Sequence, residues 1–535
     1  MSRIESALLL AGAAACLWTA AACAGQANEQ PTAISPATMP RVGTVDERFQ
    51  SYNVEMVEVT GGRFWKPFDR PGGSPPAPAQ QPATPQAPAQ PGGPNPSLYQ
   101  YRAPIDLSNP RLRKLAAALG PAYVRVSGTW RNSTYFQDSD EPAPATPPAG
   151  FNSVLTRKQW KGVIDFSRAV NAKIVTSFAI SAGTRNASGV WMPDRARLFL
   201  AYTKSAGGSI AAAELMNEPT FAGIGGAPRG YDAQAFARDF AVFRNFVKTD
   251  APGMLILGPG GVGEGTALAP TSMHLVSSQA IFSAVGPVFD VVSYHSYGAV
   301  SSRCGAMGGP ATTTAAAALT EDWLSRGERS EAYYAALRDR FEPGKPLWNT
   351  ETAQAACGGD RWASTFLDSF RYLNQLGSLA RRGVQVQMHN TLAASDYGLL
   401  DEKTYEPRPN YWAALLWRKM MGTTVLDPGP SPAPALHLYA HCMRGAPGGV
   451  VLLAINADRN DPHSLSIDHR AEIYRLTAGE LLASHVELNG KQLSLDGDDN
   501  LPRLKGETRP RGEIAFAPAS IAFLAFPKAY NASCR

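Results

Sequence analysis

Short apolar runs alternate with amphipathic segments along most of this chain. Runs with the length and the aliphatic and aromatic content of buried strands are Tyr52–Val59, Ala122–Val126, Ile174–Phe178, Ile210–Met216, Met254–Leu257, Asp290–His295, Pro346–Thr350 and Val384–Met388. Segments between them with the period of helices include Arg111–Leu119, Arg157–Asn171, Ala233–Lys248, Glu331–Arg340 and Arg361–Gly377. Eight strands alternating with helices predict an α/β fold, a (β/α)8 TIM barrel, within residues 51–422.

The pattern changes near Thr423, where helical spacing ends and short alternating runs begin. These runs are Leu436–Ala440, Val450–Ala454, Glu472–Leu476, Val486–Leu488 and Ile514–Phe526. They predict a C-terminal β-sandwich over residues 423–535. We expect the segment 36–50, which precedes the first barrel strand, to add an edge strand to that sandwich.

Two proline-rich segments interrupt the barrel pattern. Pro71–Pro96 contains almost no apolar bulk, and we expect it to be an extended insertion. It follows the first strand, so it is expected to project from the face where barrel enzymes carry their active sites. A shorter run, Asp138–Gly150, follows the second strand.

The N-terminus is typical of an export signal. Arg3 precedes an apolar, alanine-rich stretch from Ala7 to Ala22, which is too short for a membrane span. Residues 1–24 are therefore interpreted as a signal peptide, with a lipoprotein signal acylated at Cys23 as the alternative. The mature protein is expected to be periplasmic or secreted, or lipid-anchored through Cys23.

Cysteine content and charge restrict the classes of function. Four cysteines follow the signal; an even number favours disulfides in an oxidising compartment, with three pairings open, and they are Cys304, Cys357, Cys442 and Cys534. No Cys/His cluster suggests a metal, and no cofactor is expected. The composition, 44% hydrophobic and 18% charged with a net charge of +5, is that of a globular protein without the basic runs of a nucleic-acid binder.

Two glutamates carry the candidate chemistry. Glu218 follows the fourth predicted strand within Asn217-Glu218-Pro219, and Glu351 ends the seventh. A single glutamate is usually a helix cap or a solvated loop residue. Two at the carboxyl ends of barrel strands suit a glycosidase, in which one carboxylic acid protonates the leaving oxygen and the other carboxylate attacks the anomeric carbon or activates water there. Repulsion between them is expected to raise the pKa of Glu218 while Glu351 is ionised.

Neighbouring residues extend this hypothesis. Asn217 could hold a sugar 2-hydroxyl, a contact that strengthens in the transition state. His295, in Tyr294-His295-Ser296-Tyr297, ends the sixth strand on the same face as both glutamates. We expect it to contact the substrate or to orient the nucleophile.

Several blocks of this sequence form a recognisable set. They are Leu107–Thr129, Glu214–Pro219, Asp290–Tyr297, Glu351–Thr352 through Gly358-Gly359, Asp396–Gly398 and Asn410–Trp412. Together these blocks resemble glycoside hydrolase family 79, the family of heparanases and β-glucuronidases. The resemblance implies that Glu218 is the acid/base and Glu351 the nucleophile. It implies sugar contacts for Asn217, Thr129, His295 and Tyr297.

The resemblance also implies a site for the uronate carboxylate. Gly358, Gly359 and the hydroxyl of Tyr397 would hold it, since exposed glycine N–H groups can form an anion-binding nest. Two departures stand out: Glu55 occupies the place of a sugar-contacting aspartate, and Cys357 that of a tyrosine. Cys442 and Cys534 correspond to the family's sandwich disulfide, and we also predict Cys304–Cys357, between the loops after the sixth and seventh strands.

The resulting prediction is a retaining β-glucuronidase that acts on a carbohydrate carrying β-linked glucuronate. Exo action is expected, because no Lys/Arg cluster accompanies the catalytic loops and the insertion could wall off the far side of the sugar site. Three alternatives are open. They are an endo-acting heparanase-like glycosidase, a barrel glycosidase for neutral sugars, and a non-catalytic carbohydrate-binding surface lipoprotein.

Overall fold

A computed structural model describes residues 33–69, 96–266, 275–305 and 312–535. The expected signal peptide with Cys23, and the proline-rich insertion up to residue 95, lie outside the described residues. In the ranges that are described, no helix combines the length and apolarity needed to cross a membrane.

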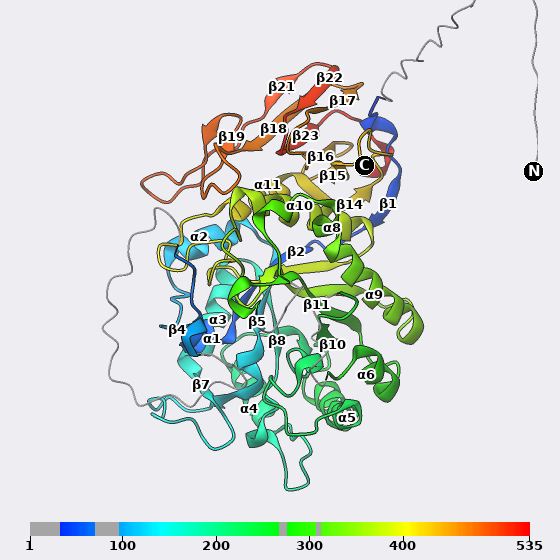
Figure 1. The fold of residues 1–535 in the computed structure, drawn as a ribbon. Coiled ribbons are helices and arrows are strands. Elements are labelled where there is room, and N and C mark those ends of the chain that lie inside the picture. Colours follow the sequence, from blue (N-terminus) through cyan, green and yellow to red (C-terminus); the bar gives the residue numbers. More distant parts are fainter. Residues whose placement is uncertain (1–32, 70–95, 267–274, 306–311) are drawn as a thin grey trace, which may run out of the picture. The chain divides into compact units, whose positions relative to one another are not determined.

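Eight parallel strands close into a barrel (Figure 1). In chain order they are β2 (Gln50–Glu55), β5 (Ala122–Ser127), β8 (Ala172–Ser177), β9 (Ile210–Glu214), β10 (Leu255–Val262), β11 (Val291–Val300), β12 (Leu347–Ala356) and β13 (Val386–His389). Pairing of β13 with β2, from Gln387 opposite Gln50 to His389 opposite Tyr52, completes the ring. Each predicted strand corresponds to one barrel strand, so the predicted barrel is confirmed.

Some strand boundaries differ from the prediction. The first strand stops at Glu55, and helix α1 (Met56–Thr60) follows, because Glu55 and Glu58 form a capping box in which the Glu55 N–H donates to Glu58 Oε2 over 2.8 Å. Strands β11 and β12 continue past their predicted ends and stay paired up to Val300 opposite Ala356. His295 and Glu351 therefore lie inside strands rather than at their ends.

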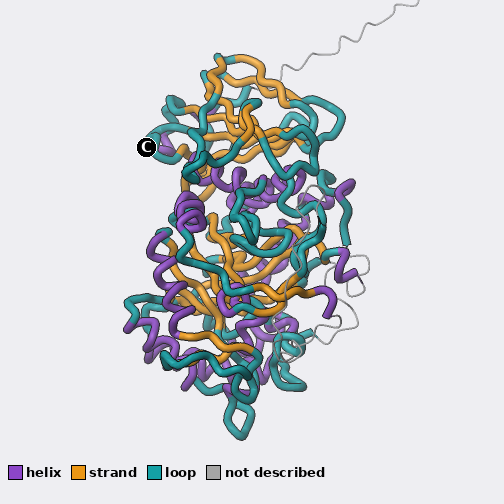
Figure 2. Tube along the Cα trace, turned by 90° about the vertical axis from the view of Figure 1, so that its left-hand side faces the viewer, coloured by secondary structure: helices purple, strands orange, loops and turns teal. Residues whose placement is uncertain are grey.

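Helices surround the barrel strands (Figure 2). They are α2 (Pro110–Ala118), α3 (Arg157–Ala169), α4 (Asp194–Ser205), α5 (Ala233–Asp250), α6 (Ser278–Val285), α8 (Glu321–Leu324), α9 (Arg326–Phe341), α10 (Phe366–Arg381) and α11 (Pro409–Met420). The predicted helices correspond to α2, α3, α5, α9 and α10. The largest differences are at α9, which begins five residues before the predicted Glu331, and at α10, which begins five residues after the predicted Arg361.

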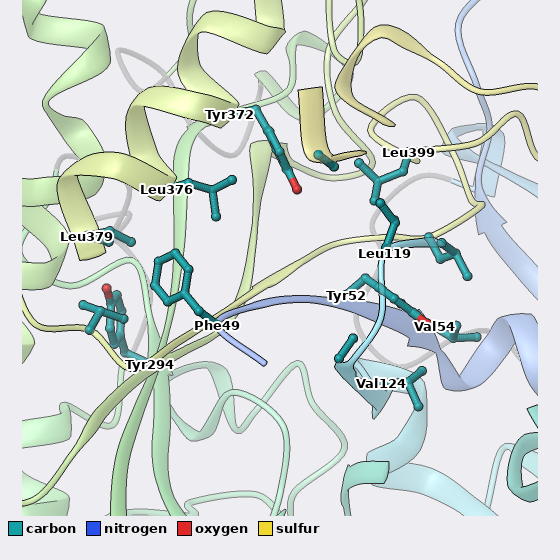
Figure 3. Close-up of a cluster of buried hydrophobic side chains, with 14 of the residues drawn as sticks. Phe49, Tyr52, Val54, Leu119, Val124, Tyr294, Tyr372, Leu376, Leu379 and Leu399 are labelled. Atoms are coloured by element: carbon teal, nitrogen blue, oxygen red, sulfur yellow. The ribbon is translucent and has the colours of Figure 1, made fainter. Parts of the chain in front are cut away.

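The core between barrel and helices is built from aromatic and aliphatic side chains. Figure 3 shows Tyr372, Leu376 and Leu379 of α10 facing Phe49 and Tyr52 at the first barrel strand. The spacing of three to four residues places the α10 side chains on one helix face. This buried face holds α10 against the barrel.

Antiparallel sheets form the C-terminal part. A nine-stranded sheet contains β1 (Arg41–Thr44), β14 (Met421–Leu426), β15 (Leu436–Met443), β16 (Val450–Asn456), β18 (Ala471–Thr477), β19 (Glu487–Leu488), β20 (Lys491–Gln492), β21 (Glu507–Arg509) and β23 (Ser520–Phe526). A two-stranded sheet contains β17 (His463–Ile467) and β22 (Gly512–Phe516). One apolar core joins side chains of both sheets, which is the packing expected of a sandwich.

The edges of this sheet refine the sequence prediction. Strand β1, from the segment before the barrel, pairs with β14, as expected of an added edge strand. The run predicted as one strand over Ile514–Phe526 is two strands, β22 and β23, which belong to different sheets. Ala519 between them has a φ of +46°, a turn conformation that ends the first strand.

Helix α10 also contacts the antiparallel sheet. The hydroxyl of Tyr439, on β15, donates to Asn374 Oδ1 over 2.7 Å. Gly377 lies under the same ring, where a Cβ atom would be 2.2 Å from Tyr439 Cγ. The helix approaches β15 this closely because position 377 has no side chain.

Two further strand pairs flank the proline-rich segments. Strands β3 (Gly62–Trp65) and β4 (Tyr99–Arg102) pair antiparallel on either side of the first segment. Strands β6 (Thr134–Gln137) and β7 (Ser153–Thr156) pair parallel on either side of Asp138–Gly150.

Candidate active site

The two glutamates meet at the carboxyl end of the barrel. Glu218 lies four residues past the end of β9 in a left-handed conformation, with a φ of +49°, and Glu351 lies in β12. One carboxylate oxygen of each and one ring nitrogen of His295 all lie within 4.8 Å of one another. Retaining glycosidases hold their carboxyl groups roughly 5–5.5 Å apart and inverting enzymes roughly 6.5–9.5 Å apart, so this short spacing favours the retaining arrangement.

Glu351 is surrounded by donors. Its Oε2 accepts from Nη1 of Arg125 over 2.7 Å, and its Oε1 accepts from the hydroxyl of Tyr297 over 2.5 Å. Arg125 is almost fully buried, where its charge acts through little screening. Both oxygens of Glu351 thus accept from fixed donors, a setting that suits a carboxylate nucleophile.

Glu218 has a different environment. Its Oε1 lies 2.9 Å from Nδ1 of His295, and its side chain keeps 18% of its surface exposed. Burial raises the pKa of Glu218 to about 7, and the charge of Glu214 adds to the effect while Arg125 opposes it. The direction is the expected one, but burial rather than Glu351 is the main cause. A carboxyl group with this pKa can donate a proton near neutral pH.

His295 is neutral in this setting. It is fully buried, and burial lowers its pKa to about 4 in spite of the nearby carboxylate of Glu351. A neutral imidazole can hydrogen-bond Glu218 in either protonation state of the acid. His295 is therefore placed to hydrogen-bond Glu218. Its Nδ1 also lies 3.8 Å from Glu351 Oε2, and the expected contact to the substrate or orientation of the nucleophile stays a prediction.

A buried ionic network beneath the glutamates was missed by the sequence reasoning. Nη2 of Arg125 donates to Glu214 Oε2 over 2.9 Å and to Asn217 Oδ1 over 2.8 Å. Glu214 also accepts from the hydroxyls of Ser293 and Thr350. Burial opposes its ionisation, but Arg125 prevails and the pKa of Glu214 is lowered. The sequence signal that could have revealed this network was one charged residue inside each of two predicted apolar strands, Arg125 in one and Glu214 in the other.

Asn217 is held by its backbone as well as its side chain. Its N–H donates to Asn132 Oδ1 over 2.8 Å, and its carbonyl accepts from Asn132 Nδ2 over 2.9 Å. Asn132 belongs to the 3₁₀ turn Thr129–Ser133. This turn begins at Thr129, for which the resemblance implied a sugar contact. The turn after β5 thus fixes the residue that precedes Glu218.

A second group of polar side chains meets at Asn390, which also contacts Tyr297. Nδ2 of Asn390 lies 3.0 Å from Glu55 Oε1 and 3.2 Å from the hydroxyls of both Tyr297 and Tyr397. The structure brings Glu55, Tyr297 and Tyr397 together around Asn390. The resemblance pointed to the first three residues but not to the asparagine. Glu55 Oε2 and Asn390 Oδ1 are buried without a partner among the described residues. Such atoms fit the hydroxyl groups of a polar ligand.

The glycine pair forms a tight turn beside Tyr397. Cys357, Gly358 and Gly359 have φ of +64°, +85° and +85°, and a Cβ atom at Gly359 would be 3.1 Å from the Tyr397 nitrogen. The N–H of Gly359 donates to the Ala355 carbonyl over 3.1 Å. That donor is therefore engaged within the turn, and the expected nest could offer an anion only the N–H of Gly358.

Both predicted disulfides are present. Cys304–Cys357 joins the segment after β11 to the glycine turn after β12. Cys442–Cys534 joins β15 to the C-terminal residues.

Glu218, His295 and Glu351 form the one His/carboxylate group that could hold a metal ion in the described part of the chain, but Arg125 and Tyr297 already engage both oxygens of Glu351. The arrangement favours acid–base and nucleophilic chemistry.

Comparison with known proteins identifies relatives of this chain. Residues 102–377, about half of the chain, match the model described as glycosyl hydrolase family 79, N-terminal domain. Heparanase-like protein 1 of Arabidopsis thaliana is 26% identical over 489 residues, covering 80% of this chain and 86% of that protein. Bos taurus heparanase is 27% identical over 494 residues, with 80% and 86% covered.

A further relative and two solved structures extend the comparison. Baicalin-beta-D-glucuronidase of Scutellaria baicalensis is 25% identical over 468 residues, covering 79% of this chain and 84% of that protein. A 4-O-alpha-L-rhamnosyl-beta-D-glucuronidase from Fusarium oxysporum 12S shares the fold with a TM-score of 0.61 at 12% identity, covering 92% and 99% of the two chains. A GH51 alpha-L-arabinofuranosidase from Thermotoga petrophila RKU-1 shares it with a TM-score of 0.60 at 13% identity, covering 92% and 98%.

Proposed function

Because the chain belongs to glycoside hydrolase family 79, we propose that it is a retaining β-glucuronidase that removes β-linked glucuronate from small glucuronides or from glycan ends. One observation carries the proposal. Two glutamates whose facing oxygens lie within 4.8 Å of each other have opposite surroundings, with Glu351 paired to Arg125 and Glu218 buried beside a neutral histidine. These surroundings suit a nucleophile and an acid.

The first step forms a glycosyl-enzyme ester. Glu351 attacks the anomeric carbon while Glu218 gives its proton to the departing glycosidic oxygen, so the aglycone leaves as a neutral alcohol. In the second step Glu218, now a carboxylate, takes a proton from water as the water displaces Glu351. Two inversions at the same carbon return the β configuration.

Recognition of the uronate is proposed at the Tyr397 hydroxyl and the Gly358 N–H, with Asn390 Nδ2 donating to the Tyr397 oxygen. Tyr397 is fully buried, and burial together with the charge of Glu55 keeps its pKa well above the usual range. Its hydroxyl is then a neutral donor that suits a carboxylate. The name of baicalin-beta-D-glucuronidase fits a β-D-glucuronide substrate.

A panel of nitrophenyl glycosides tests this function. We expect the β-D-glucuronide to be turned over and the matching β-D-glucoside to be disfavoured strongly, because buried donors lose their partner when the carboxylate is missing. Comparable rates on both sugars would favour the glycosidase for neutral sugars. Lack of turnover on the whole panel would favour the carbohydrate-binding protein.

Product stereochemistry provides an independent check. NMR of the sugar released early in the reaction should show the β anomer of glucuronic acid. The α anomer would contradict the double displacement without contradicting the sugar preference.

An extracytoplasmic location accompanies the proposal. The two disulfides are consistent with an oxidising compartment. Periplasmic, secreted and Cys23-anchored forms differ in the N-terminal residue of the mature protein. Mass spectrometry of the N-terminal peptide from the native host would distinguish an acylated Cys23 from simple cleavage after Ala24.

A further inference from the structure

The segment after β11 grips the glycine turn through several separate contacts. We define residues Ser301–Cys304 as the clasp and residues Ala356–Asp360 as the recognition turn. The Ser301 N–H donates to the Ala356 carbonyl over 3.0 Å, and the Ser302 N–H and hydroxyl donate to the Asp360 carboxylate over 3.0 and 2.9 Å. The Cys304–Cys357 disulfide adds a covalent link.

Arg303 connects the recognition turn to the loop that carries Tyr397. Its guanidinium donates to the Gly359 carbonyl over 3.3 Å, pairs with Asp396, and donates to the Lys66 carbonyl. The side chain is only 6% exposed. A planar fork with several donors can hold acceptors from three chain segments at once, which a lysine cannot do.

The turn needs such external support. Cys357, Gly358 and Gly359 all have φ in the left-handed region, where Cys357, having a Cβ, is strained. The Gly358 carbonyl accepts from the Ser395 hydroxyl over 3.0 Å and from the Asp396 N–H over 3.1 Å. The position of the turn is thereby tied to that of Tyr397.

From these contacts we infer that the clasp sets the sugar specificity of the enzyme. Arg303 and the Cys304–Cys357 disulfide are positioning residues that fix the recognition turn, with its Gly358 N–H, relative to the loop that carries Tyr397. The inference rests on the proposed function. Neither residue contacts the reacting atoms, and neither contacts Glu218 or Glu351 in the described part of the chain.

The first test removes the disulfide. The Cys304→Ser/Cys357→Ser variant should raise KM for nitrophenyl β-D-glucuronide and lower the glucuronide-to-glucoside ratio of kcat/KM about tenfold, since a charged hydrogen bond is weakened. kcat should change less than KM. The matched control, Cys442→Ser/Cys534→Ser, should lower the Tm and leave the ratio unchanged.

The second test keeps both disulfides and changes Arg303. Arg303→Gln and Arg303→Lys should both lower the ratio, because lysine restores the charge but not the fork. Arg361→Gln is the control: Arg361 is exposed, and its guanidinium lies 4.5 Å from the Phe68 ring that Arg303 also contacts at 4.0 Å. Arg361→Gln removes one positive charge beside the same ring. It should leave the glucuronide-to-glucoside ratio of kcat/KM within about twofold of the wild-type value, as most surface changes do.

The outcomes separate the inference from the function on which it rests. A wild-type enzyme without glucuronide preference would overturn the proposed function. A wild-type preference that persists in folded Cys304→Ser/Cys357→Ser protein, or in Arg303→Gln protein if the cysteine variant does not fold, would overturn the clasp alone. Full recovery by Arg303→Lys would also overturn it, since charge would then suffice.

Discussion

At the scale of single residues, the two glutamates proposed as acid and nucleophile have contrasting neighbours. Arg125 and Tyr297 bind both oxygens of Glu351, whereas Glu218 has His295 and partial contact with solvent. Arg125 is itself held by Glu214, whose lowered pKa keeps it an anion. The buried Arg125 thus pairs with Glu351, while burial keeps the pKa of Glu218 raised.

The raised pKa of Glu218 predicts how activity depends on pH. Glu218 must be protonated to act, so kcat/KM should be retained below its pKa of about 7 and should fall about tenfold for each pH unit above it. The effect should be largest on an alkyl glucuronide, whose leaving group needs the proton. Constant kcat/KM on that substrate from pH 6 to pH 9 would contradict the assignment of the acid.

Substitution of each glutamate tests the division of roles. Glu351→Ala should abolish turnover of every substrate. Glu218→Ala should still form the glycosyl-enzyme from nitrophenyl glucuronide, because an activated phenol hardly needs protonation. Added azide should then raise its turnover and yield a β-glucuronosyl azide, detectable by NMR. Equal losses on good and poor leaving groups would contradict the role of Glu218.

At the scale of elements, helix α10 links the barrel to the antiparallel sheet. One face packs on the first barrel strand, where the Gln50 amide donates to the Tyr372 hydroxyl over 3.1 Å. Another part of the helix meets Tyr439 of β15 at Gly377. A poorer fit of this helix against β15 should therefore lower the stability of the protein.

Gly377→Ala tests that fit. Alanine normally stabilises a helix interior relative to glycine, but here its Cβ would lie 2.2 Å from the Tyr439 ring, and overpacking costs about 1–3 kcal/mol. Gly162→Ala in α3 is the matched control, because that Cβ would meet no atom within 4 Å; it should be neutral or stabilise by about 0.5–1 kcal/mol. Thermal unfolding of both variants measures the difference. Equal Tm values would show that α10 and β15 can separate without cost.

At the scale of the whole molecule, folding brings together basic residues that are scattered in the sequence. Arg303 and Arg361 both lie against the ring of Phe68, at 4.0 and 4.5 Å. The sequence did not indicate that these two arginines meet. Asp396 pairs with Arg303, so the added charge available to a sulfated chain is small.

Exo action remains the prediction at this scale. A polymer with glucuronate at its non-reducing ends should release free glucuronate from the start of digestion while its average length changes slowly. Size-exclusion chromatography with monosaccharide analysis follows both quantities. A rapid fall in polymer length without free glucuronate would favour the endo-acting, heparanase-like alternative.

Much of the fold was determined by the sequence alone. Strand and helix periods are local properties, since each apolar run must bury itself whatever its partner, and eight strands alternating with helices favour few arrangements other than a barrel. Glu218 and Glu351 were found in the same way, as carboxylates that follow or end apolar runs. Strand ends were less accessible to this reasoning, because pairing between β11 and β12 decides how far each continues.

The tertiary structure decided which residues in the site pair with one another. Arg125 and Glu351 are 226 positions apart, and Glu55 and Asn390 are 335 apart; only closure of the barrel brings each pair within hydrogen-bonding distance. Packing between distant segments also decided which arginine holds the recognition turn. A local pattern can show that a side chain is charged and buried, but its pKa and role depend on neighbours that long-range packing supplies.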